Sequence, residues 1–575
     1  MWANRARQPA VNATAITRRF RVRNIRPTIA LGRRYYASNE QEATEGRPPS
    51  SNWFWSSLGL AGTATAAFLV YSYMTRPDES EFLKNIQNSS KSIEDLSAQY
   101  VQKKQSLKSP GLYLWGTNEY RVVDPESKSS VVKVPRRLSY FDNHVLRDLK
   151  IGETSGAAIL ENGDLVQWGK GYSETEFKPT KTFTGKNLVS LSMSHDRIIA
   201  LSSDSKVYSL PVSRHDQLSG QKSQEASWVP FWNSSASVSY RRIQPSLKIG
   251  EKITAISGGL EHVLLLTSSG RVFSAAASSE NFPSFGQLGV AGLTWATRPP
   301  GPVDAPHEVN VPNGAKVKQI ATGDYHSLLL TREGDVLAFG DNAFGQLGMG
   351  FDPAMPFRDT PLRIPVKDLY REAGRVPQAT SVAAGGANSF FTVDVQQVGP
   401  TRDLKDAGKV TSDVWTCGRG IWGALGNGKW THLQDRPIKL KALSGLVEYD
   451  ETTQGLAPIR LNDISVGTTH VSAILGNQTH LNRSASSVEG ADDAGLDVVW
   501  WGGNEHFQLG TGKRSNLSKP AHINVASEAA SDDKELARLQ IMPAHRGTVG
   551  SKSINMRQRV TCGRHVSAIY TTFEK

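Results

Sequence analysis

Short apolar strands separated by glycine-rich turns recur along most of the chain. In the clearest unit, residues 317–350, a first strand ends at Gly323, a second begins at His326, and a third contains Val336 and Phe339. The unit closes on Gly345-Gln346-Leu347-Gly348, where glycine suits a tight backbone. Apolar runs of four to eight residues between turn signals predict strands rather than helices. The pattern therefore predicts an all-β protein built from repeats.

The number of units follows from the spacing of this pattern. Six internal units are recognisable, at residues 146–171, 188–210, 253–289, 317–350, 379–428 and 461–512. The chain also ends on a first half-unit, residues 560–570, and its repeat region begins with a second half-unit, residues 111–116. Joined, the two halves make a seventh unit, and closure by both termini hides the sheet edges. We therefore expect a seven-bladed β-propeller over residues 111–575.

The repeated order is Gly-x-x-His, an aliphatic strand, a glycine-containing hairpin, a Trp-Gly or Phe-Gly dipeptide, and Gly-x-Leu-Gly. This order resembles the regulator-of-chromosome-condensation (RCC-type) repeat, and the resemblance implies a propeller. The units of that family are more uniform, because this chain carries long insertions. We expect them to form loops on the propeller faces. The insertions are residues 211–248, 290–316, 427–460, 476–497 and 511–559.

The N-terminal segment has the composition of a mitochondrial presequence. Residues 1–39 contain nine arginines, no lysine and no acidic residue, which is typical of a transit peptide. Arg33-Arg34-Tyr35-Tyr36 resembles a matrix-processing site with cleavage after Tyr36, so we predict a presequence over residues 1–36. The alternative is a basic arm that binds nucleic acid or an acidic membrane surface.

A membrane anchor and a stalk are predicted next. After a linker at residues 37–52, residues 53–74 carry no charge, and as a helix they would span about 33 Å, close to one hydrocarbon thickness. Trp53, Trp55, Tyr71 and Tyr73 place aromatic rings at both interfaces. A buried core helix is the alternative. Residues 75–110 read as an amphipathic helical stalk, serving either as a solvated spacer or as a docking helix.

Charge and residue chemistry exclude several functions. The net charge of +12 comes mostly from the arginines of residues 1–39, so we expect no nucleic-acid partner. Cys417 and Cys562 fall in distant repeats and predict no disulfide. The histidines at repeat positions lie around a ring rather than at one metal, and we expect them to bond backbone within or between blades. These histidines are His195, His262, His326, His470 and His565.

The sequence contains no zinc-protease, phosphate-loop, dinucleotide-binding or nucleophile-elbow pattern. We therefore predict a protein that is not an enzyme, with no catalytic, cofactor-binding or metal-binding residues and no small-molecule substrate. The aromatic stretch Trp228-Val229-Pro230-Phe231-Trp232 is a candidate contact within the insert loops. It is equally explained as a loop folded back over a blade.

The order of presequence, single span and divergent propeller resembles a fungal mitochondrial inner-membrane member of the family that serves assembly of respiratory complex III, the cytochrome bc complex. The resemblance implies a membrane-anchored interaction platform whose partners are complex III subunits or assembly intermediates. One alternative is a guanine-nucleotide exchange factor for a small GTPase, as in other relatives. Another is a matrix-side translation or ribosome scaffold. The charge rule for membrane orientation favours a propeller in the intermembrane space over one in the matrix.

Overall fold

The computed structural model describes residues 109–225, 234–279, 281–372, 374–398, 409–450, 454–477, 479–480, 494–523, 539–549 and 552–574. The predicted presequence, linker and span, and the stalk up to residue 108, lie outside these ranges, as does the stretch Trp228–Trp232. Within the described ranges, no helix is both long and apolar enough to cross a membrane.

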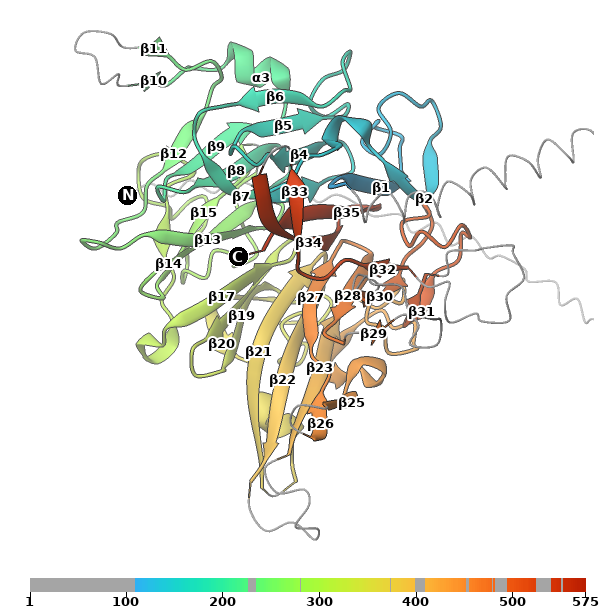
Figure 1. The fold of residues 1–575 in the computed structure, drawn as a ribbon. Coiled ribbons are helices and arrows are strands. Elements are labelled where there is room, and N and C mark those ends of the chain that lie inside the picture. The colour runs from blue at the N-terminus through green and yellow to red at the C-terminus, as the bar shows by residue number, and fades with distance from the viewer. Residues whose placement is uncertain are drawn as a thin grey trace, which may run out of the picture. The chain divides into compact units, whose positions relative to one another are not determined.

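Seven antiparallel sheets form the repeat region (Figure 1), in agreement with the predicted propeller. In blades 1 to 6 the first strand lies at one sheet edge and the next two follow outward in chain order. The strands are, for blade 1, β3 (Asp148–Ile151), β4 (Gly156–Ile159), β5 (Leu165–Trp168) and β6 (Thr180–Phe183); for blade 2, β7 (Leu188–Met193), β8 (Arg197–Ser202), β9 (Val207–Pro211) and β12 (Arg241–Ile243); for blade 3, β13 (Ile253–Gly258), β14 (His262–Thr267), β15 (Val272–Ala276) and β16 (His307–Glu308); for blade 4, β17 (Val317–Thr322), β18 (His326–Thr331), β19 (Val336–Asp341) and β20 (Phe357–Arg363); for blade 5, β21 (Arg375–Gly385), β22 (Asn388–Gln397), β23 (Val410–Gly418) and β24 (Gln434–Lys439); for blade 6, β27 (Leu461–Val466), β28 (His470–Leu475), β30 (Ala494–Gly502) and β31 (Leu517–His522).

The seventh blade is built from both ends of the repeat region. Its strands are β34 (Lys552–Cys562), β35 (Val566–Phe573), β1 (Leu112–Thr117) and β2 (Val131–Arg137), with β33 (His545–Val549) added beside β34. The pairing runs from Leu112 opposite Tyr570 to Gly116 opposite Val566. The predicted closure by the two half-units is confirmed, and it hydrogen-bonds strand edges that would otherwise be free.

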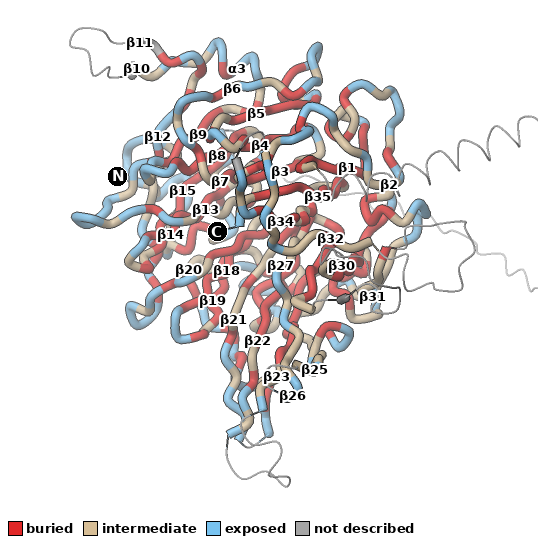
Figure 2. Tube along the Cα trace, in the orientation of Figure 1, coloured by how far each residue is buried: buried red, intermediate tan, exposed pale blue. Residues whose placement is uncertain are grey.

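The hydrophobic core lies between neighbouring blades, which explains the unbroken apolar runs in the sequence. In β14, Val263 and Leu265 pack with blade 2, whereas Leu264 and Leu266 pack with blade 4. Because successive side chains of a strand point to opposite faces, a strand covered on both sides needs apolar residues at every position. Figure 2 accordingly shows the strands largely buried and the connecting loops exposed.

The predicted insertions contain short elements as well as loops. Blade 5 also differs from the other blades: β21 and β22 have 11 and 10 residues, against six in β17 and six in β18, and they extend beyond their neighbours in Figure 1. The remaining elements are α3 (Arg214–Ser219), β10 (Gln224–Glu225), β11 (Ser234–Ser235), β25 (Val447–Asp450), β26 (Gly455–Pro458), β29 (Thr479–His480), β32 (Gln540–Ile541), η1 (Ser139–Phe141), η2 (Pro312–Gly314), η3 (Val366–Leu369) and η5 (Lys441–Leu443).

Candidate functional site

Three of the repeat histidines join neighbouring blades. Each is fully buried at the start of the second strand of its blade, and its Nε2 lies 2.7–2.9 Å from a serine hydroxyl in the next blade. Each serine hydroxyl in turn donates to the backbone carbonyl of a glutamine in the Gln-Leu-Gly loop of the histidine's own blade, at 2.6–3.3 Å. The sets are His262–Ser327–Gln287, His326–Ser389–Gln346 and His470–Ser567–Gln508.

This chain of bonds fixes the protonation of the imidazoles. Since the single serine proton is committed to the glutamine carbonyl, Nε2 must carry the proton that the serine oxygen accepts. The other ring nitrogen, Nδ1, is buried and has no hydrogen-bond partner in the described ranges. Burial lowers the pKa of His262, His326 and His470 to about 3. These histidines are therefore neutral structural groups. Their bonds reach the adjacent blade, but the partner is a serine hydroxyl and not the backbone that was predicted.

The prediction that five histidines are equivalent is wrong for His195 and His565. A backbone bond identifies the equivalent position in each blade. In blade 3 the N–H of Gly259 donates to the carbonyl of His262, three residues later, at 2.9 Å. In blade 2 that bond runs from Ser194 to Arg197, and in blade 7 from Gly563 to Val566. His195 and His565 therefore lie in the turns before the second strand. The spacing of two residues between Gly563 and His565 would have distinguished the latter from the sequence alone.

The tryptophans of the Trp-Gly dipeptides make a second set of bonds between blades. Trp501 Nε1 donates to Ala424 O at 2.7 Å, and Trp115 Nε1 donates to Gln508 O at 2.9 Å. In blade 5 a cysteine, Cys417, takes this position, with its Sγ 3.5 Å from Gln346 O. Cys417 and Cys562 are buried and free, as predicted. The loops that contain Ala424, Gln508 and Gln346 thus each accept a bond from the following blade.

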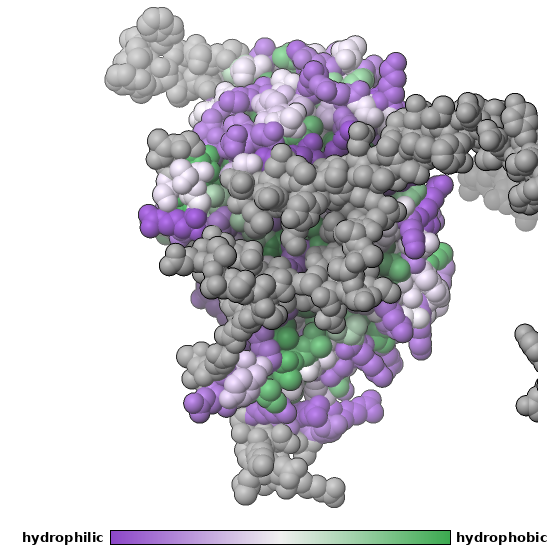
Figure 3. Space-filling view, turned by 45° about the vertical axis from the view of Figure 1, so that its right-hand side comes forward, coloured by the Kyte–Doolittle hydropathy of each residue, from purple (hydrophilic) through white to green (hydrophobic). Residues whose placement is uncertain are grey.

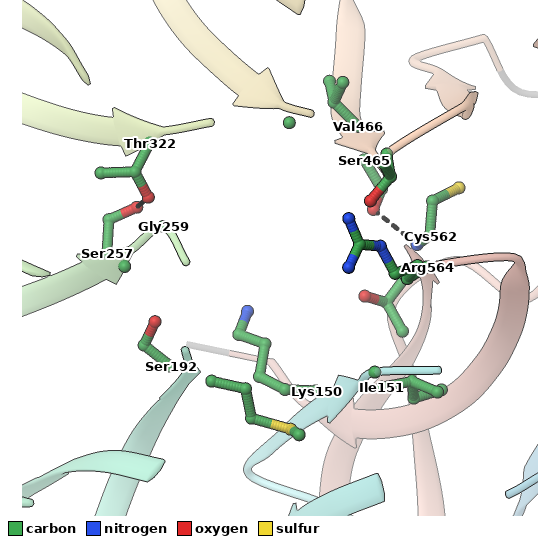
Figure 4. A pocket seen from close by; sticks show the side chains of 18 of the residues that line it. Lys150, Ile151, Ser192, Ser257, Gly259, Thr322, Ser465, Val466, Cys562 and Arg564 are labelled. Atoms are coloured by element: carbon green, nitrogen blue, oxygen red, sulfur yellow. Dashed lines mark hydrogen bonds between the residues drawn. The ribbon is translucent and has the colours of Figure 1, made fainter. Parts of the chain in front are cut away.

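A central cavity of about 520 Å³ is lined by the first strands of all seven blades. Hydroxyl groups of Ser192, Ser257 and Thr322 face it, and the side chains of Lys150 and Arg564 extend into its open centre (Figure 4). These charges meet opposite charges: Lys150 Nζ lies 3.8 Å from Asp148, and Arg564 lies 3.9 Å from Asp324.

The Arg564–Asp324 pair joins turns of blades 7 and 4, which are not neighbours in the ring, and so spans the cavity. Burial raises the pKa of Asp324, and Arg564 opposes that rise. A polar lining with balanced charges suits water or a small polar solute better than an apolar ligand. Within the described ranges, no cluster of three or more His, Cys, Asp or Glu side chains could hold a metal ion.

Aromatic side chains gather in the loops that follow the third strands of blades 3, 4 and 5. We call this group the aromatic rim. Trp295 is 60% exposed and Trp430 is 54% exposed. Solvent-exposed aromatic groups of this size are typical of interaction surfaces. The aromatic rim consists of Phe282, Phe285 and Trp295 from blade 3, Phe344 and Phe351 from blade 4, and Trp422 and Trp430 from blade 5.

Hydrogen bonds connect the loops of the rim across the three blades. Gly292 N donates to the Asp359 carboxylate at 2.8 Å, which ties the blade 3 loop to β20 of blade 4. Gln434 N of blade 5 donates to Phe344 O of blade 4 at 3.3 Å. The loops are therefore fixed against one another, and their aromatic residues, far apart in sequence, form one surface.

Three arginines accompany the rim. The guanidinium of Arg298 lies 4.3 Å from the centre of the Trp295 ring. That of Arg419 lies 4.6 Å from both Phe344 and Trp422, one ring from each of two blades. Arg358 donates to the carbonyls of Met355 and Phe357. None of the three forms an ion pair with a carboxylate in the described ranges, so the rim combines exposed aromatic rings with positive charge that no carboxylate partner neutralises.

A second apolar surface lies at the other end of blade 5. Gly445, just before β25, bonds to Ser412 near the start of β23, whereas the rim residue Trp422 follows the end of that strand. In Figure 3 a hydrophobic patch appears in the lower part of the molecule, at the height of β22, β23 and β25 in Figure 1. The exposed apolar residues of this region are Val376, Val398, Val447, Tyr449 and Leu456.

Comparison with known proteins shows what the chain is similar to. Residues 317–346 match the family described as the Regulator of chromosome condensation (RCC1) repeat. The structure resembles that of Prp20p from Saccharomyces cerevisiae, also described as yeast RCC1, with a TM-score of 0.51, 18% identity, and coverage of 81% of this chain and 92% of Prp20p. The chain is a seven-bladed propeller that contains an RCC1 repeat. The predicted resemblance to this repeat and the predicted propeller are confirmed, whereas the predicted transmembrane helix and the stalk up to residue 108 lie outside the described residues.

Two curated relatives of this RCC1-repeat propeller come from Saccharomyces cerevisiae. "Protein FMP25, mitochondrial" is 24% identical over 486 residues, which cover 80% of this chain and 72% of the relative. "Guanine nucleotide exchange factor SRM1" is 24% identical over 282 residues, covering 46% of this chain and 54% of the relative. The match to FMP25 therefore extends over far more of this chain than the match to the exchange factor.

The sequence alone did not reveal the aromatic rim. Trp295 and Trp430 lie in two of the insertions for which binding loops were predicted, so the insertions were a partial signal. Phe285 and Phe344 instead lie at the edge of the repeat pattern itself, directly before Gly286 and Gly345. Only the order of the blades around the ring brings these four side chains together.

Proposed function

We propose that this protein is a non-catalytic, membrane-anchored interaction platform of mitochondria that assists assembly of respiratory complex III. The observation that carries the proposal is the similarity to mitochondrial FMP25 over 80% of the chain. The arginine-rich residues 1–36 and the uncharged residues 53–74 support the same location. The resemblance in layout to a fungal assembly factor supports the link to complex III.

The aromatic rim is the surface that we propose for the partner. Tyrosine, tryptophan and arginine dominate the residues that carry binding energy in protein interfaces. The rim offers two exposed tryptophans and three arginines on loops that hydrogen bonds connect, so binding would cost little ordering of the protein. Complex III subunits or their assembly intermediates are the proposed partners.

The test compares assembled respiratory complexes on native gels. Cells lacking the gene should lose complex III while complexes IV and V persist. A variant with Trp295→Ala and Trp430→Ala should reproduce the loss at normal protein level, because both side chains are exposed and support no core. Tyr449→Ala, which removes a side chain 63% exposed near the start of β23, is the matched control and should leave complex III intact. An unchanged amount of assembled complex III in cells lacking the gene would contradict the proposed function.

The propeller is proposed to lie in the intermembrane space. Arrest of residues 53–74 in the inner membrane with the arginine-rich end inside would leave it there. Protease added to mitochondria with a ruptured outer membrane should then digest the propeller. Protection of the propeller until detergent is added would place it in the matrix and favour a translation or ribosome scaffold instead.

Exchange-factor activity is the second candidate, because the chain is similar over 282 residues to the exchange factor SRM1. Release of labelled GDP from mitochondrial small GTPases should accelerate on adding the purified protein if this candidate is right. Absence of acceleration, together with failure to bind the nucleotide-free GTPases, would leave the assembly platform as the working function.

A further inference from the structure

We infer that the aromatic rim receives an acidic segment of a partner protein, with Arg419 binding a carboxylate and the neighbouring rings holding apolar side chains beside it. The inference rests on the proposed function in taking the rim as the partner surface. It adds the chemistry of the segment that is bound.

Arg419 is held ready for such a ligand. Its backbone N–H donates to Ala387 O at 3.1 Å, which fixes the start of the loop. Its guanidinium lies 4.6 Å from the centre of the Phe344 ring and 4.6 Å from the centre of the Trp422 ring. A guanidinium close to two rings has little freedom to rotate, and its N–H groups match the two oxygens of a carboxylate. Arg419 Nε is buried and has no hydrogen-bond partner in the described ranges. The side chain as a whole is only half-buried, so its terminal N–H groups are the ones that a ligand can reach.

Two further arginines extend the positive charge along the rim. Arg298 donates to Gly301 O at 3.2 Å, and Arg358 donates to Met355 O at 2.9 Å and Phe357 O at 3.1 Å. Carbonyl groups orient these guanidiniums but leave their charge uncompensated. Charge complementarity across an interface steers encounter and selects partners, so each arginine without an ion pair offers a place for one carboxylate of a bound segment.

The carboxylates of the rim argue against a uniform polyanion. Asp359 accepts from Gly292 N at 2.8 Å, Asp352 from Ala354 N at 2.9 Å, and Asp435 from Phe351 N at 3.1 Å. The rim loops therefore carry carboxylates as well as arginines. A nucleic acid or an anionic bilayer would meet both signs at once, whereas a short peptide segment can place one carboxylate at Arg419 and apolar side chains on the rings.

The experiment places a photo-crosslinking benzoylphenylalanine at position 430 of the full chain, in cells of the source organism, and identifies the adducts by mass spectrometry. The same group at position 249, where Ile249 is fully exposed in the segment before β13, is the control. We expect position 430 to crosslink one protein, at a segment with Asp or Glu within about five residues of the adduct.

Arg419→Gln should lower the yield of that crosslink at least about tenfold, the effect of removing a dominant interface side chain. Arg419→Lys should give an intermediate yield, because it keeps the charge without the planar fork. The unfolding temperature of both variants is measured as the folding control. If Arg419→Gln lowers the unfolding temperature, a charge exchange between the two proteins is the deciding test. Arg419→Glu, combined with Lys in place of the crosslinked acidic residue of the partner, should restore the crosslink.

Lipid or nucleic-acid adducts at position 430, a protein segment without acidic residues, or a yield no higher than at position 249 would overturn the inference. The identity of the crosslinked protein tests the proposed function separately. An acidic segment of a protein unrelated to complex III would leave the inference standing and remove complex III assembly. Loss of complex III in cells without the gene, together with no crosslink from the rim, would support the proposed function and overturn the inference about the acidic segment.

Discussion

Acidification from pH 7 to pH 5 should destabilise the propeller through His262, His326 and His470. Burial lowers the pKa of each imidazole to about 3, against about 6.5 in an unfolded chain. Below pH 6.5 these histidines are protonated in the unfolded chain, whereas in the folded chain they stay neutral until the pH nears 3. The free energy of unfolding therefore decreases as the pH falls below 6.5. Each histidine should remove about 2 kcal/mol between pH 7 and pH 5, and the three together about 6 kcal/mol.

Differential scanning calorimetry of the purified protein checks this loss. An unfolding entropy of about 2.1 cal/mol/K per residue, over roughly 470 residues, makes 1 kcal/mol equal to about 1 °C in Tm. The three histidines should therefore contribute a fall of about 6 °C. Aspartates and glutamates also titrate in this range, so a matched variant is needed to isolate the histidine share.

His326→Asn is that variant, because Asn388 holds the same position in blade 5. At pH 7 it should unfold at a lower temperature than the wild type, since the bond to the Ser389 hydroxyl is lost. Between pH 7 and pH 5 its Tm should fall about 2 °C less than that of the wild type, because one titrating group is gone. Parallel loss of Tm in the two proteins would refute the role given to His326.

Three further outcomes are expected. Burial raises the pKa of the Cys417 and Cys562 thiols to about 12, so neither should react with Ellman's reagent at pH 8 until denaturant is added; two rapidly reacting thiols in the folded protein would contradict their burial. Trp501→Phe removes the bond to Ala424 O while keeping an aromatic ring, and should lower the free energy of unfolding by about 1–3 kcal/mol in urea titration; an unchanged midpoint would mean that the bond contributes nothing. Truncation before Val566 deletes β35, which pairs with both β34 and β1, and should abolish cooperative thermal unfolding; a sharp transition near the wild-type temperature would show that ring closure is dispensable.

The blade count was predictable because the sequence repeats the features that each blade needs. A strand covered on both faces requires an apolar run such as Val263–Leu266, and the turn before it requires a residue like Gly259. These demands are local, so they recur in the sequence at each blade. The same reasoning joined residues 111–116 to residues 560–570, since half a blade cannot bury its own faces.

The length of blade 5 and the equivalence of the histidines were harder to predict. β22 and β23 pair from Asn388–Gly418 to Gln396–Val410, but residues 393–413 mix polar and apolar positions without a clear period. His565 lies two residues after Gly563, whereas His262 lies three residues after Gly259. A search for a histidine that follows a glycine ignores this difference in spacing. In both cases the pairing of strands, rather than the residue types, fixes the outcome.

The bonds that hold the blades together also support the proposed binding surface. Gln346 O accepts the hydroxyl of Ser389, which His326 holds in place. The side-chain oxygen of Gln346 accepts the backbone N–H of Phe344, a ring that contacts Arg419. The bonds that lock blade 4 to blade 5 therefore also position the ring at the centre of the aromatic rim. Because the strands supply this support, the exposed ends of the loops remain free to carry the residues that select a partner.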